Sequence, residues 1–114
     1  MTQQELLLQL NTTPELVQFS DVIQMITTHF DYQATRFKNG DIVNEAGSNE
    51  GSCKLLYFAQ FKQLSETQTL HLFGDYYRQD VLANPSGSDH GNIRNFMKFG
   101  WQGVQFEGVA LAEK

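Results

Sequence analysis

The sequence contains one cysteine, two prolines and only eight basic residues against thirteen acidic ones. One Cys cannot form an internal disulfide, so a reducing cytoplasm is the simplest expected compartment. The basic residues are scattered and the net charge is −5, so they form no patch that would neutralise nucleic-acid phosphates or bind an anionic membrane surface. No apolar run approaches the ~20 residues that cross a bilayer. We therefore expect neither nucleic acid nor a membrane as a partner.

The length and composition are typical of one globular domain, which we expect to span residues 1–114. Hydrophobic residues make up 40% of the chain, and its nine Phe, four Tyr and one Trp predict an aromatic core. A chain of this size buries enough surface to fold without a metal or a disulfide. The first ten residues, MTQQELLLQL, lack the basic start and the long apolar stretch of a secretory signal.

Apolar residues recur at helical spacing over most of the chain. The motif TPE (13–15) is a helix start signal, and the segment after it is expected to form one bent helix or two. The motif SETQ (65–68) has the pattern of a capping box, and Gly74-Asp75 could interrupt the helix that it opens. Asp89 is expected to cap the last helix, which Gly100 would end. The expected helices cover residues 2–10, 13–26, 52–64, 65–81 and 89–99.

Two short segments favour β-structure instead. Asn39-Gly40 suits a two-residue hairpin turn, which predicts strands over residues 34–38 and 41–44. The segment GVQFEGVAL (103–111) alternates weakly and could form a second hairpin that pairs with the first. Because the strands sit in hairpins and do not alternate with helices, the fold class is α+β. We expect a single compact domain of about five helices with one or two short antiparallel β-hairpins.

Polar residues gather in three separate segments, 44–54, 75–80 and 89–95, each at an expected helix start. If these segments converge, they frame one polar pocket, and such pockets are the usual place for a ligand. The candidate ligand-binding residues are Asn44, Glu45, Asn49, Glu50, Cys53, Tyr76, Arg78, His90, Asn92, Arg94 and Asn95.

Cys53 has two interpretations. It lies in the first turn of the helix 52–64, where backbone N–H groups favour a thiolate. His90 with Asn92 or Asn95 could then complete a Cys–His–Asn arrangement. A single Cys is also often a small buried hydrophobic residue with no chemical role.

The two Asn-Glu pairs, 44–45 and 49–50, could bind a cation or a ligand amine. They could equally satisfy turn backbone and complement the helix dipole, and Ser48 and Ser52 could also serve as caps. The acids lack the spacing of an EF-hand, and the three His and one Cys lie far apart in the sequence. No metal site is therefore expected.

The basic candidates also have structural alternatives. Arg78 is expected to pair with Glu45 or Glu50, although it could instead grip an anionic ligand. His90 and Arg94 lie four residues apart and share a helix face, where they could hold an anion. The alternative is a solvated face in which nearby polar side chains cap the helix.

Three runs of the sequence are similar to one protein family. FKNGDIVNEAGSNEGSCK, LFGDYYRQDVL and DHGNIRNFMKFGWQGV, which lie between about Phe37 and Phe106, resemble the HopJ family. This small bacterial family is named after a type III secreted effector of plant pathogens. The resemblance implies no established catalytic residue, and residues 2–26 carry helical apolar patterning unlike a disordered, Ser-rich export signal.

We therefore expect a HopJ-like protein that acts as a cytoplasmic binding or regulatory domain with a polar pocket, without covalent chemistry or a cofactor. Its partner would be a small polar ligand or a protein. One alternative is a type III secreted effector that acts in a host cell. Another is a small enzyme that uses Cys53 or a Glu/His pair, and the sequence leaves enzymatic activity and oligomeric state undecided.

Overall fold

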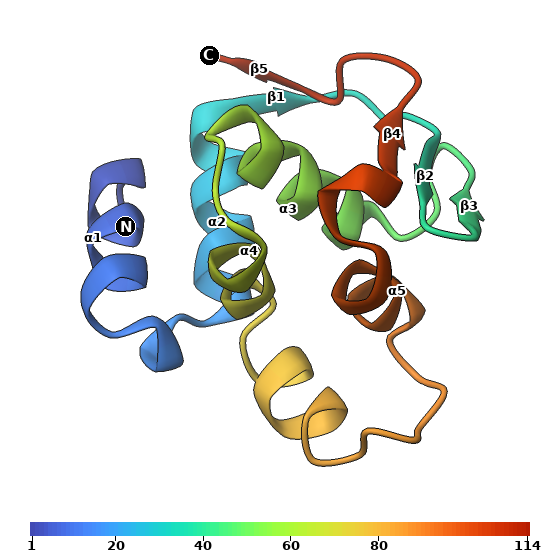
Figure 1. The fold of residues 1–114 in the computed structure, drawn as a ribbon. Helices are drawn as coiled ribbons and strands as arrows, with labels where there is room; N and C mark the ends of the chain where they lie inside the picture. Colours follow the sequence, from blue (N-terminus) through green and yellow to red (C-terminus); the bar gives the residue numbers. More distant parts are fainter.

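The computed structural model describes all residues from 1 to 114, and it is an α+β domain as expected. Figure 1 shows α2 and α3 at the centre, α1 on the left, one small sheet across the top and the other at the upper right. The α-helices are α1 (Gln3–Thr12), α2 (Phe19–His29), α3 (Glu50–Phe61), α4 (Glu66–Leu72) and α5 (Gly91–Phe99). The 3-10 helices are Pro14–Leu16 and Gly100–Gly103, and a π-helix covers Tyr76–Val81.

The helix start signals fold as expected at one place and differently at another. The Ser65 side chain accepts a hydrogen bond from the Gln68 N–H, and Gln68 accepts one in return from the Ser65 N–H, which completes the capping box. Thr13 forms no side-chain cap; a 3-10 turn follows it, and α2 begins separately at Phe19. The two-helix alternative for this segment is therefore correct. None of the helices combines the length and apolar character needed to span a bilayer.

The strands form two small antiparallel sheets. The strands are β1 (Phe30–Tyr32), β2 (Phe37–Asn39), β3 (Ile42–Asn44), β4 (Val104–Phe106) and β5 (Leu111–Glu113). The order in the three-stranded sheet is β3-β2-β4, and β1 pairs with β5 in the other sheet. The predicted second hairpin is wrong, because β4 and β5 pair with different strands, although β4 does extend the first hairpin.

The turn of the first hairpin lies one residue later than predicted. Asn39 pairs with Ile42 in the ladder, so the two turn residues are Gly40 and Asp41. Gly40 has a φ of +63°, which glycine adopts without the steric cost of a side chain. Asn39 is consequently a strand residue and is fully buried. This shift gives Asn39 a structural role in place of a role in the turn.

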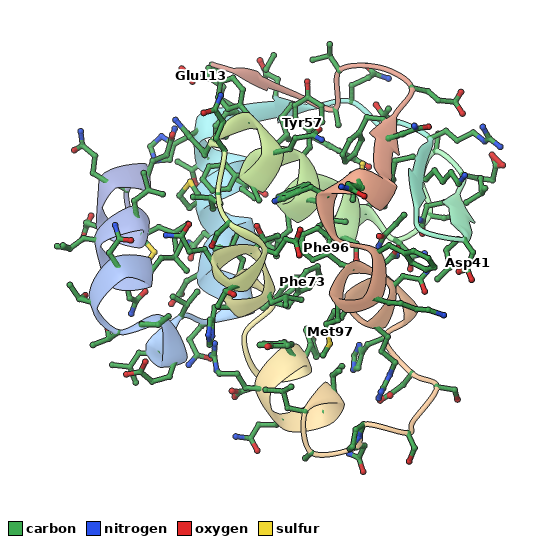
Figure 2. All side chains as sticks on the ribbon, viewed as in Figure 1. Asp41, Tyr57, Phe73, Phe96, Met97 and Glu113 are labelled. Carbon is green, nitrogen blue, oxygen red and sulfur yellow. The ribbon has the colours of Figure 1, made fainter.

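The core is aromatic, as the composition predicted. The largest fully buried side chains include Phe37, Phe58, Phe73 and Phe96. Phe73 and Phe96 lie in the interior between α4 and α5 (Figure 2). Each buried ring contributes roughly 1.5–3 kcal/mol relative to an exposed one. The aromatic interior therefore holds α5 against the rest of the domain, at the place where the candidate site lies.

Candidate functional site

Helices α3 and α5 begin in the same unusual way. Their N-cap residues, Asn49 and His90, have φ of 52° and 51°, in the left-handed region, whereas N-caps normally have extended backbone. Neither side chain caps its own helix. The predicted caps Ser48, Ser52 and Asp89 form no capping hydrogen bond either. Asp89 instead accepts a hydrogen bond from Arg94 at 2.6 Å. Capping therefore does not explain the polar residues at these helix starts.

The first N–H groups of both helices consequently have no partner in the protein. The first main-chain bonds run from Cys53 N–H to the Asn49 carbonyl and from Arg94 N–H to the His90 carbonyl. The N–H groups of residues 50–52 and 91–93 precede these bonds and donate to no protein atom. Free N–H groups at a helix start carry partial positive charge and favour an electronegative partner.

A buried cluster of amide side chains holds the two helix starts together. Asn44 and Asn92 exchange hydrogen bonds, at 3.1 Å from Asn44 Nδ2 and 2.9 Å from Asn92 Nδ2. Asn39 Nδ2 donates to the Asn92 carbonyl and side chain at 2.9 and 3.0 Å, and Asn49 Nδ2 donates to Asn44 Oδ1 at 2.8 Å. Asn39 Oδ1 is the one buried side-chain atom of this asparagine cluster without a protein partner. The cluster joins the β2–β3 hairpin to both helix starts.

A pocket of about 410 Å³ lies between the starts of α3 and α5. Its polar lining consists of Asn49, Ser52, Tyr76, His90 and Asn92. Its apolar lining consists of Phe19, Ile42, Phe73 and Ile93, and Gly51 and Gly91 complete the wall. No lining residue is acidic, although the protein as a whole carries a net charge of −5.

The third predicted segment reaches the pocket through the π-helix. Tyr76 lies in the lining, and its ring centroid is 5.2 Å from that of His90. Asp80 Oδ2 is 2.9 Å from His90 Nε2 and orients the imidazole, with Asp89 Oδ2 at 3.8 Å. A π-helix is a rare element that recurs at functional sites, and here it lets Tyr76 and Asp80 both reach His90.

Four of the candidate residues predicted from the sequence line the pocket: Asn49, Tyr76, His90 and Asn92. Asn44 does not line the pocket, but it is hydrogen-bonded to the lining residues Asn92 and Asn49. Residues from three polar segments that are distant in the sequence therefore meet at the pocket. The charged candidates from these segments, the Glu and Arg side chains, do not line it.

The arginine candidates face elsewhere. The predicted ion pair of Arg78 with Glu45 or Glu50 is wrong, because Arg78 donates to the main-chain carbonyls of Pro14, Val17 and His71. It thereby ties the 3-10 turn before α2 to α4. Its only acidic neighbour is Asp75, at 3.8 Å.

Arg94 and Glu45 are also engaged away from the pocket. Arg94 donates to Asp89 and to the Asn84 carbonyl, at 2.9 Å, and so holds the loop before α5. Glu45 pairs with Arg36, which also bonds Glu107 directly after β4. These charges stabilise loops and do not enter the pocket.

The remaining candidates, Glu50, Asn95 and Cys53, do not line the pocket. Asn95 donates to the Asn39 carbonyl and to Asp41, at 2.8 and 2.7 Å, and so fixes the hairpin turn. Cys53 is 1% exposed, and its thiol donates to the Thr35 carbonyl. Burial raises the pKa of the Cys53 thiol, which opposes the thiolate that a nucleophile needs. No group of three or more His, Cys, Asp or Glu side chains could hold a metal ion.

The sequence reasoning missed the glycines and the apolar side of the pocket. A Cβ atom at Gly51 would lie 3.0 Å from Phe19, and one at Gly91 would lie 3.1 Å from Ile42. Both glycines therefore let a lining side chain pack directly on a helix start. The available signal was a glycine soon after a residue that tolerates positive φ, in NEG (49–51) and HG (90–91).

Comparisons with known proteins define the family. The model of the HopJ type III effector protein family matches residues 3–111. The solved crystal structure of VPA0580, a protein of unknown function, is 42% identical with a TM-score of 0.97, and the alignment covers 100% of this chain and 95% of that one. No curated protein matches the chain. The chain is thus a small α+β protein that belongs to the HopJ family.

The buried thiol gives a direct test of the alternative enzyme. Because the folded protein shields Cys53, iodoacetamide at pH 8 should label it at least roughly 100-fold more slowly than in the guanidinium-unfolded chain. A Ser86→Cys variant, with its added thiol on an exposed loop, supplies the control and should label rapidly at that second site. Equal labelling rates for folded and unfolded Cys53 would restore the nucleophile interpretation.

Proposed function

We propose that this protein is a small cytoplasmic binding domain whose pocket holds a polar ligand with an anionic group, without covalent chemistry. The observation that carries the proposal is the meeting of two uncapped helix starts at one pocket. Free N–H groups at residues 50–52 and 91–93 are donors, and the dipoles of both helices favour negative charge at this end.

The charges around the pocket support an anionic group at the helix starts. Neither Asp nor Glu lines the pocket, and the nearby carboxylates of Asp80 and Asp89 lie against the His90 ring. Arg and Lys are also absent from the lining, which leaves main-chain N–H groups and neutral side chains as the recognising groups. An anion held mainly by main-chain donors needs a rigid backbone, and the asparagine cluster supplies that rigidity.

The chemistry of the lining supports binding without reaction. Cys53 is buried and lies outside the lining, so no thiol faces the pocket. Ser52 and His90 both face it, but the ring of His90 bonds Asp80 and not the Ser52 hydroxyl. A nucleophile and its base must be within hydrogen-bond reach, and the pocket contains no such pair.

A charge placed at the pocket tests the proposal. Methyl phosphate, titrated into the wild-type protein, should shift the amide resonances of Gly51, Ser52 and Gly91 and saturate at roughly millimolar concentration. Ser52→Glu should weaken this binding at least about tenfold, because its carboxylate competes for the free N–H groups and repels the ligand. The fold should persist, since an acid in the first turn of a helix is favourable.

Ser86→Glu is the matched control, because it adds the same charge on an exposed loop outside the pocket lining. It should leave methyl phosphate binding unchanged. The proposal fails if the wild-type pocket amides do not respond to methyl phosphate, or if both Glu variants weaken binding equally.

We place the protein in the cytoplasm and treat export as the alternative that the family description favours. Export by a type III system would carry the same binding domain into a host cell. A reporter fused after residue 30 and expressed in a strain with an active type III system separates the two. Transfer of the reporter would contradict the cytoplasmic assignment, and absence of transfer would end the effector alternative.

A further inference from the structure

One wall of the pocket consists of aromatic rings that come from four different elements. Phe19 is at the start of α2, Phe73 follows α4, Tyr76 begins the π-helix and His90 occupies the N-cap position of α5 without capping it. The Phe19 and Tyr76 rings lie 5.1 Å apart at 69°, and the Phe19 and Phe73 rings lie 6.4 Å apart at 12°. These contacts fix the rings relative to one another.

Tyr76 is the exposed member of this aromatic wall. Phe73 is 2% exposed and belongs to the core, whereas Tyr76 is 46% exposed. The Tyr76 hydroxyl has no hydrogen-bond partner in the protein, and the ring is positioned by Phe19 and His90. His90 is in turn held by Asp80. Core packing therefore does not account for Tyr76, which is a fixed ring presented at the mouth of the pocket.

A second hollow continues beyond this ring. It measures about 260 Å³ and is lined by Gln18, Phe19, Ser20, Asp75 and Tyr76. Phe19 and Tyr76 line both hollows, so the pair forms the ridge between them. A ligand that extends from the main pocket into the second hollow passes over these two rings.

The surrounding charges give a ligand one orientation. The free N–H groups lie at the starts of α3 and α5, whereas the carboxylate-bearing residue Asp75 lines the second hollow. An anionic group is therefore favoured at the helix starts and disfavoured near the ridge. The part of the ligand that contacts Phe19 and Tyr76 must be uncharged or bear hydrogen-bond donors.

We propose that the ligand is an anion that carries a planar aromatic ring, and that this ring lies against Tyr76 at the ridge while the anionic group meets the helix starts. This proposal rests on the proposed function for the anionic group of the ligand, and it adds the chemical class of the rest of the ligand. An aromatic face recognises a planar ring by offset stacking and buries its surface at the same time. A ring stacked on Tyr76 would bury aromatic surface that the protein leaves exposed.

Two phosphate esters of equal charge test this inference. At pH 8, phenyl phosphate should bind the wild-type protein about five- to tenfold more tightly than methyl phosphate, as measured by calorimetry and by pocket amide shifts. Tyr76→Leu should abolish this preference, because leucine offers no aromatic face on which the phenyl ring can stack. Tyr76→Phe should retain the preference, because the hydroxyl is not required.

Phe61→Leu is the matched control, since Phe61 is 51% exposed at the far end of α3 and lies outside both hollows. It should leave the preference unchanged. Equal affinities for phenyl and methyl phosphate in the wild type would overturn the ring proposal while leaving the proposed function intact. Failure of both esters to bind would overturn the proposed function, and with it the ring proposal.

Discussion

The structure depends on how it satisfies a few buried amide side chains. Asn39, Asn44 and Asn92 are each less than a tenth exposed and come from two strands and a helix. A buried polar group left without a partner costs about 1–3 kcal/mol, so these side chains stabilise the fold only in the arrangement that pairs them. The reciprocal bonds between Asn44 and Asn92 therefore fix the position of α5 on the β2–β3 hairpin.

That constraint explains why two helix starts face one pocket. Asn49 uses its amide to bond Asn44 and adopts left-handed backbone, so it does not cap α3. His90 has the same backbone conformation and directs its ring toward Asp80. At both helices the side chain that would normally satisfy the first N–H groups is committed to tertiary structure. The free donors are a consequence of the network that holds the elements together.

The aromatic wall depends on a separate backbone constraint. Gly74 has a φ of +63°, and a Cβ atom there would lie 2.8 Å from the Phe19 main-chain nitrogen. Only glycine allows the chain to pass this close to the start of α2. The π-helix that follows then brings Tyr76 against Phe19 and His90. The two walls of the pocket thus arise independently, one from side-chain amides and one from a close backbone approach.

Local patterns in the sequence predicted the fold class, the aromatic core and the capping box at Ser65, because each depends on residues near one another in the chain. The pairing of β4 and β5 with different strands was not predictable, since alternation does not identify a partner strand. The convergence of segments 44–54, 75–80 and 89–95 was a hypothesis based on polar density, and the Glu and Arg side chains of these segments do not line the pocket. The orientation of the Arg78 side chain could not be predicted, because its partners are main-chain carbonyls that carry no signature in the sequence.

A double-mutant cycle on Asn44 and Asn92 tests the central claim most directly. Asn44→Ala leaves the Asn92 Nδ2 group without its acceptor, and Asn92→Ala does the same to the Asn44 Nδ2 group, whereas the double variant removes both groups together. Chemical denaturation should therefore show that the losses of unfolding free energy in the two single variants, added together, exceed the loss in the double variant by at least about 1 kcal/mol. Additive losses, equal within about 0.5 kcal/mol, would contradict the claim that this amide pair holds α5 to the hairpin.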